Sequence, residues 1–243
     1  MQPPIFRPIG LLFLLTAAAL AAPASGFPPE VPAGRSFEFE VRELFFRGLR
    51  GDQAALDRAM RLCEDALAVD AGDAEALVWH GSGLVFRAGQ AYEAGDLTAG
   101  GLLLERGLDE MDRAVGLEPD TLATRIPRAT TLIALADNTP LPGLARDYRR
   151  KAVGDLEKVW QLQRPYFEHV SVHGRGELMA GLADAYLKMG DSERALEILT
   201  RMAQELPGSS YAEEARRFLS APRDELPAAV RTCHGCHDGG DGS

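Results

Sequence analysis

The sequence predicts an all-α fold of about four helical hairpins, followed by a short irregular C-terminal tail. From residue 36 onward the chain is rich in Ala, Leu, Arg and Glu, and its apolar residues recur at helical rather than alternating spacing. Gly-Asp pairs at 51–52, 95–96 and 190–191 separate the helical stretches. Similar sequences recur at four points along the chain, as expected for four pairs of helices.

The Gly-Asp pairs are typical of the tight turn inside a helical hairpin. Glycine readily adopts the left-handed conformation that ends one helix, and an aspartate carboxylate accepts hydrogen bonds from the first N–H groups of the next.

The spacing of apolar residues also predicts two apolar helix faces. Cys63 lies on one of them, so we expect it to be a buried free thiol. Two such faces follow from the spacing: Leu56, Met60, Cys63 and Leu67, and Ala195, Ile198, Leu199 and Met202.

Four segments with similar sequences mark where the helix pairs end. They are residues 66–71, 114–119, 159–165 and 202–207, and their last positions are 48, 46 and 42 residues apart. Within the last helix pair, a small and an aromatic residue precede the Gly-Asp turn, and Ala, Leu and Pro follow it. The residues in question are Leu182, Ala183, Tyr186, Ala195, Leu199 and Pro207, with partial matches in the second pair at Trp79, Gly83, Phe86, Ala114 and Pro119.

This pattern resembles the tetratricopeptide repeat (TPR) family, whose unit has about 34 residues. The resemblance covers residues 36–220. It implies a TPR-like α-solenoid that binds a protein partner on its surface and carries no chemistry of its own. It also implies that Trp79, Phe86 and Tyr186 are packing residues rather than a ligand box.

The second hairpin is longer than the repeat that it resembles. It has 44 residues from Ala76 to Pro119, and a turn at 95–96 assigns five extra residues to its first helix and seven to its second. Antiparallel helices lengthened by similar amounts still pack along their full length, so we expect an elongated hairpin. Pro127 leaves two alternatives for the next hairpin: its first helix starts near this proline, or it is kinked there.

The N-terminus has the pattern of an export signal. Arg7 is the only charged side chain in the first 29 residues, and the apolar or small run Ile9–Ala22 has 14 residues. A bilayer-spanning helix needs about 20 residues, whereas a signal peptide is shorter and ends in small residues such as Ala22-Pro23-Ala24. We expect a signal peptide at 1–24, a Pro-rich spacer at 25–35 and an exported, periplasmic chain with no stable membrane span after cleavage. A retained N-terminal anchor is the alternative.

The tail at 221–243 carries the most specific motif in the chain. Cys233-x-x-Cys236-His237 is the attachment pattern of c-type haem. The two thiols can form thioethers with the two vinyl groups of the porphyrin, and the adjacent imidazole can reach the iron. Export agrees with this interpretation, since resemblance to c-type cytochromes implies attachment outside the bacterial cytoplasm. The expected cofactor is therefore haem c, held by Cys233, Cys236 and His237, with His237 as the metal ligand.

Other interpretations of this motif stay open. Cys233 and Cys236 could form a disulfide in an oxidising compartment, or the motif could bind a metal such as zinc. If haem is bound, no Met or His follows His237, so the sixth iron ligand would come from the helical body, a partner or water, or be absent. Within the body the candidates are His80, His169 and His173, of which the last two, at i and i+4, could share one helix face.

Composition disfavours other classes of function. The chain has 26 basic and 36 acidic residues, a net charge of −10 and no long basic stripe, so nucleic-acid binding is not expected. It has no serine-hydrolase, metalloprotease or phosphate-loop motif, so we do not expect an enzyme. We expect an exported TPR-type interaction scaffold with one covalent haem c, acting in periplasmic electron transfer or in assembly of a redox complex, with a cytochrome or respiratory complex as partner. The alternatives are a haem-free structural interaction module, whose terminal cysteines form a disulfide or bind metal, and a small-ligand haem sensor.

Overall fold

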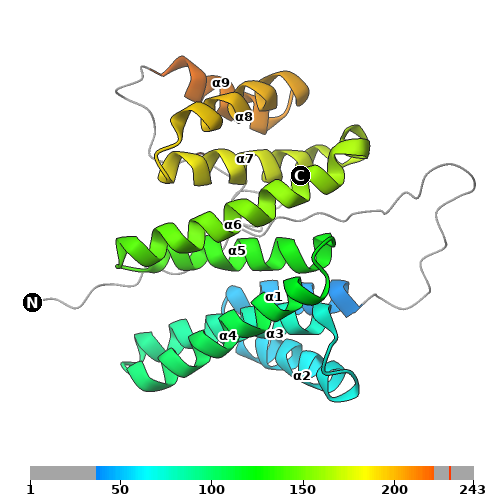
Figure 1. Cartoon of the computed structure of the whole chain (residues 1–243), viewed down its shortest axis with the longest axis vertical. Helices are drawn as coiled ribbons and strands as arrows, with labels where there is room; N and C mark the ends of the chain where they lie inside the picture. The colour runs from blue at the N-terminus through cyan, green and yellow to red at the C-terminus, as the bar shows by residue number, and fades with distance from the viewer. Residues whose placement is uncertain (1–36, 222–229, 231–243) are drawn as a thin grey trace, which may run out of the picture. The chain divides into compact units, whose positions relative to one another are not determined.

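The computed structural model describes residues 37–221 and Val230. Within these residues the fold is all-α, with nine α-helices, one 3-10 helix and no β-strand (Figure 1). The helices form two compact units, and the boundary between them falls inside α5, after Thr131. The segments predicted as signal peptide (1–24) and spacer (25–35) lie outside the described residues.

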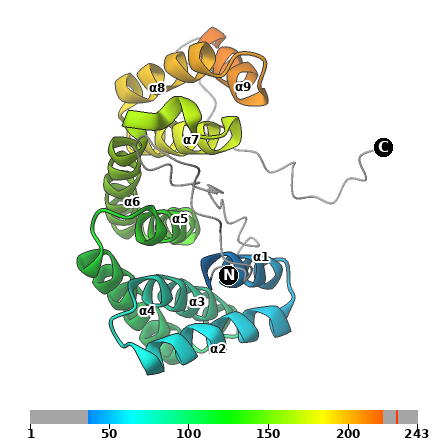
Figure 2. The same ribbon diagram turned by 90° about the vertical axis from the view of Figure 1, so that its right-hand side faces the viewer.

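The first unit contains the N-terminal helices. Its α3 contacts α1 and α2 on one side and packs along α4 on the other (Figure 2). The rings of Phe45 and Trp79 lie 5.3 Å apart, centroid to centroid, in its core. Its elements are α1 (Phe37–Leu49), α2 (Gln53–Val69), α3 (Ala74–Glu93), α4 (Leu97–Leu117) and the first part of α5 (Leu122–Asn138).

The second unit begins with the end of α5 and contains the remaining helices. α6 contacts α7, and α8 packs against both α7 and α9. The core of these last three helices includes Met179, Leu199, Met202, Phe218 and one residue from the tail, Val230. The elements are α6 (Pro142–Gln163), the 3-10 helix η1 (Arg164–His169), α7 (Val172–Lys188), α8 (Ser192–Glu205) and α9 (Ser210–Ser220).

The three predicted Gly-Asp turns are confirmed. Each glycine has a positive φ, between +82° and +100°, which an L side chain rarely adopts. Each aspartate caps the next helix: Asp52 caps α2, Asp96 caps α4 and Asp191 caps α8, and their carboxylates accept from backbone N–H groups at 3.0, 2.9 and 3.2 Å. Gly208, with a φ of +78°, and Ser209 form the same kind of turn before α9.

The predicted number of helices was too low. About four hairpins would give eight helices, whereas the described residues contain nine. The segments with similar sequences end α2, α4, α6 and α8, as expected, but α9 follows Pro207 as a single helix and has no such ending of its own. The all-α class is confirmed within the described residues, and the assignment to a TPR-type solenoid stays a prediction.

The elongated second hairpin is also confirmed. α3 and α4 have 20 and 21 residues, against 17 and 14 for α7 and α8. The two long helices approach closely at Gly81 and Gly107, where a Cβ on either residue would lie 2.6–2.7 Å from the carbonyl oxygen of the other. Pro127 lies inside α5, which starts five residues earlier at Leu122, so this helix continues through the proline.

The predicted packing residues take up their expected places. Trp79 and Tyr186 are buried and Phe86 is half-buried. On the two apolar faces, Leu67 is only partly covered, while the others are buried or packed against the core. None of the helices between residues 37 and 221 has the length and apolar character needed to cross a bilayer.

Candidate functional site

The predicted haem-attachment residues Cys233, Cys236 and His237 lie outside the described residues. The nearest described residue is Val230, three positions before Cys233. Its side chain is 4% exposed and belongs to the core formed by α7, α8 and α9. The tail is therefore anchored in the second unit immediately before the motif.

A buried carboxylate on α7 holds the backbone of this anchor. The N–H of Val230 donates to Oδ1 of Asp184 at 3.2 Å, while Oδ2 of Asp184 pairs with Lys188 at 2.8 Å. Burial raises the pKa of Asp184, against the opposing effect of the Lys188 ammonium. A buried polar group is costly unless it is hydrogen-bonded, so the tail N–H and the lysine together satisfy this acid.

The same lysine connects the anchor to α5 and α6. Nζ of Lys188 donates to Asp137 at 2.9 Å, and Arg149 pairs with Asp137 at 2.7 Å. Although burial disfavours the charged lysine, the carboxylates of Asp184 and Asp137 raise its pKa above the ordinary value. The anchor thus rests on a network of two acids and two bases within the second unit.

A second polar cluster occupies the N-terminal half of α7. The Tyr211 hydroxyl on α9 lies 2.6 Å from Oε1 of Glu177, which is 2% exposed, and 2.8 Å from Nδ1 of His173. The single phenolic proton goes to Glu177, so the phenolic oxygen accepts from Nδ1–H of His173. In the neutral ring this leaves the lone pair on Nε2, the arrangement that metal-binding histidines use.

The other candidate histidines have different surroundings. His80 is buried, with Nδ1 2.5 Å from Glu110, and the hydrogen bond from His80 lowers the pKa of Glu110 although burial opposes this. His169 ends η1 with an exposed side chain, whereas His173 belongs to α7. The expectation that His169 and His173 could share one helix face is therefore wrong, because the chain leaves the 3-10 helix between them.

Cys63 is confirmed as a buried free thiol. Burial is the largest cause that raises the pKa of this thiol, and neighbouring carboxylates such as Asp73 and Glu64 add to it. The thiolate is the reactive and metal-binding form of cysteine. Because the raised pKa disfavours this form, Cys63 is a packing residue. Within the described part of the chain, no group of three or more His, Cys, Asp or Glu side chains could hold a metal ion.

Sequence reasoning missed the anchor and the partner of His173. Glu177 and Asp184 lie on α7, four and eleven positions after His173, and this spacing alone could have revealed a polar face on an otherwise apolar helix. Tyr211 and Val230 come from α9 and the tail, and no local pattern brings them to α7. No protein-family model, curated protein or solved structure matches the chain.

Proposed function

We propose that this protein is an exported, TPR-type interaction scaffold that carries one haem c on its C-terminal tail and serves electron transfer or the assembly of a redox complex. The motif Cys233-x-x-Cys236-His237 carries the proposal. When bound, the haem would supply a one-electron redox centre. The helical body would supply the surface for a protein partner, such as a cytochrome or a respiratory complex, and no catalysis of its own.

The buried anchor at Val230 supports this proposal. Cys233 comes three positions after Val230, and an extended chain spans at most about 3.6 Å per residue. A group attached at Cys233 would therefore have its attachment point within about 11 Å of Val230. Such a short tether is useful to an electron carrier, because it keeps the redox centre close to the surface that a partner contacts.

His173 is the described histidine best suited to be a sixth ligand. Its Nδ1 is committed to Tyr211 and its ring is half-buried, which leaves Nε2 as the free donor atom. Along α7 it lies about 16 Å from Asp184 at about 1.5 Å per residue, and the seven residues from Val230 to His237 can span about 25 Å. The chain length thus permits His173 and His237 to bind one iron. His80 is hydrogen-bonded to Glu110 in the first unit, and the exposed His169 has Nε2 3.6 Å from Glu168, its equally exposed neighbour in the chain.

The test is covalent haem on the purified, denatured chain. The protein with its export signal is expressed in a host that matures c-type cytochromes, and haem is stained after denaturing electrophoresis. We expect a stained band at the mass of the chain, lost in the double variant Cys233→Ala, Cys236→Ala, with unchanged helical circular dichroism. A colourless protein with two unmodified tail thiols would contradict the proposal.

The haem-free alternative makes a different prediction for the same sample. A disulfide would protect both tail cysteines from alkylation until reduction, and bound zinc would appear in elemental analysis at one ion per chain.

If haem is bound, the oxidised visible spectrum of the His173→Ala variant should change from low-spin to high-spin, while His169→Ala should leave the spectrum unchanged. An unchanged spectrum in His173→Ala excludes His173 as the ligand but leaves haem attachment intact.

A further inference from the structure

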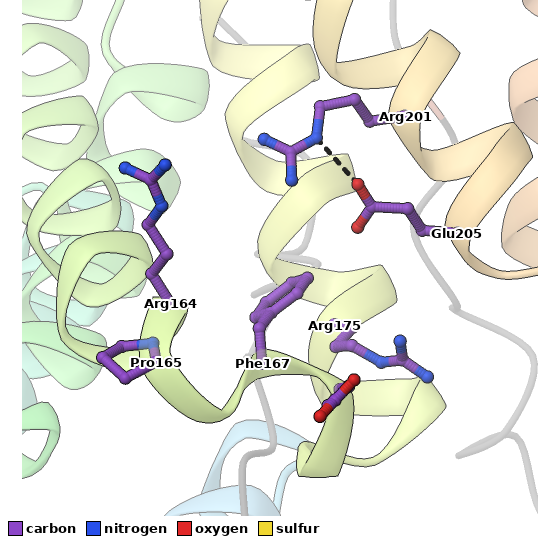
Figure 3. A pocket seen from close by; sticks show the side chains of 7 residues that line it. Arg164, Pro165, Phe167, Arg175, Arg201 and Glu205 are labelled. Atoms are coloured by element: carbon purple, nitrogen blue, oxygen red, sulfur yellow. Dashed lines mark hydrogen bonds and ion pairs between the residues drawn. The ribbon is translucent and has the colours of Figure 1, made fainter.

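A pocket in the second unit gathers arginines around an aromatic ring. It has a volume of about 410 Å³, within the usual range of small-molecule sites. Phe167 of η1 stands at its centre, with Arg164 and Arg175 on either side and Arg201 of α8 above it (Figure 3). The remaining lining residues are Pro165, Glu168 and Glu205.

Two of the three guanidinium groups have no carboxylate partner among residues 37–221. Arg201 is committed, because its Nε donates to Glu205 at 2.9 Å and its guanidinium lies 4.5 Å from the centroid of the Trp160 ring. Arg175 lies 5.9 Å from the Phe167 centroid, and its buried Nε atom has no hydrogen-bond partner. Such a buried donor is rare unless a ligand or water satisfies it.

The charge balance of the pocket defines the ligand. With Arg201 and Glu205 paired, Arg164 and Arg175 face one remaining acid, Glu168, which leaves an excess of one positive charge in a chain whose net charge is −10. A monoanion matches this excess better than a doubly charged phosphate. Arginine binds carboxylates through two parallel N–H donors, and the face of Phe167 offers a flat apolar surface.

We propose that this pocket binds a carboxylate carried on a planar, apolar body, held by Arg164 and Arg175 against Phe167. Two sources share this chemistry: a free aromatic carboxylate, and the propionate groups of the haem proposed on the tail. Phe167 and Trp160 pack against the same core that contains Val230, so Val230 and the pocket belong to the same unit. The first source is independent of the haem proposal, and only the second rests on it.

Tryptophan fluorescence provides the test. The chain has two tryptophans, so Trp79→Phe leaves Trp160, under the Arg201 guanidinium, as the only reporter. In this background the haem-free variant Cys233→Ala, Cys236→Ala is titrated with benzoate, and benzamide serves as the uncharged analogue of the same shape. We expect a saturable change with benzoate and none with benzamide. Arg175→Gln or Arg164→Gln should weaken binding tenfold or more, since each removes a charged donor pair.

The matched control is Arg150→Gln on α6, whose exposed guanidinium pairs with Asp147 away from the pocket. The Arg150→Gln variant should bind benzoate like the parent.

The haem-loaded chain then separates the two sources of the carboxylate. Benzoate binding equal to that of the haem-free chain indicates a free carboxylate, and loss of benzoate binding indicates that the haem propionates occupy the pocket. No saturable change with benzoate in the haem-free chain, equal binding of benzamide, or an unaltered affinity in both arginine variants would overturn the proposal. All three of these overturning results are measured on the haem-free variant, so they do not depend on whether the wild-type chain binds haem covalently.

Discussion

The backbone N–H of Val230 and the buried carboxylate of Asp184 are joined by a hydrogen bond of 3.2 Å, although they are 46 positions apart in the chain. The Val230 side chain fills the same core. Through these two contacts Val230 is part of the folded second unit. The hydrogen bond joins Val230 to α7, the helix that also carries His173 and Glu177 of the polar cluster with Tyr211.

Shortening the anchor should therefore destabilise the protein. Val230→Ala removes two buried methyl groups, and we expect a loss of about 1.5–2 kcal/mol in the free energy of unfolding. Urea denaturation monitored by circular dichroism measures this loss of stability. The control is Val69→Ala, at a side chain that is 92% exposed, which should change stability little. Equal stability of the two variants would mean that Val230 does not pack in the core.

The phenol of Tyr211 should contribute to stability because its acceptor is buried. Tyr211→Phe removes a donor to Glu177, which is 2% exposed, and we expect a cost of about 1–3 kcal/mol. Tyr186→Phe is the matched control, since its hydroxyl also donates to a glutamate, Glu157, but that side chain is 42% exposed and water can replace the donor. Thermal unfolding should show a larger loss for Tyr211→Phe. The opposite order would argue against a buried, positioning role for the Tyr211 hydroxyl.

The close approach of α3 and α4 predicts opposite effects for two glycines of the same helix. A Cβ at Gly107 would lie 2.7 Å from the backbone oxygen of Gly81, so Gly107→Ala must separate the helices, and we expect a loss of about 1–3 kcal/mol. Gly116 has open space around its Cβ position, so Gly116→Ala should stabilise α4 by about 0.5–1 kcal/mol. Melting temperatures of both variants against the parent test this pair. Similar effects at both positions would contradict the close contact.

Local chemistry explains which parts of the fold could be predicted. A Gly-Asp pair determines a positive φ and a helix cap within two residues, so Gly51, Gly95 and Gly190 were identified without knowledge of the rest of the chain. The turn at Gly208-Ser209 uses the same chemistry with serine as the cap. It has neither the Gly-Asp pattern nor one of the repeated endings, so the sequence patterns do not reveal it.

Contacts between distant segments explain what could not be predicted. His173 was a candidate from its residue type, but its partner Tyr211 lies 38 residues away on α9. The arginines of the pocket come from η1, α7 and α8, and their sequence neighbours give no sign that they converge. The motif at Cys233, Cys236 and His237 is the reverse case: its spacing alone carries the prediction, and it lies outside the described residues.

Glu75, in the first turn of α3, should make stability depend on pH. Burial, assisted by the carboxylates of Glu38, Asp73 and Glu118, raises its pKa from 4.5 to about 7, and its Oε1 atom is buried without a hydrogen-bond partner. Between these two values the folded chain binds more protons than the unfolded chain, so this group lowers the stability as pH rises through the window. The loss of stability caused by Glu75 is complete above about pH 7 and absent below about pH 4.5.

Glu75→Gln removes this titration while keeping the shape of the side chain. We expect the variant to be more stable than the parent at pH 8, by about 1 kcal/mol once the shift is reduced for the partial exposure of the group, and to match it near pH 4.5. The measurement is the urea midpoint of both proteins across this pH range. Glu93→Gln, at an exposed position at the other end of α3, should leave the pH profile of the parent unchanged. If Glu75→Gln and the parent show parallel profiles, the pKa of Glu75 is not raised in the folded chain, because only a raised pKa makes the stability difference between them grow as pH increases.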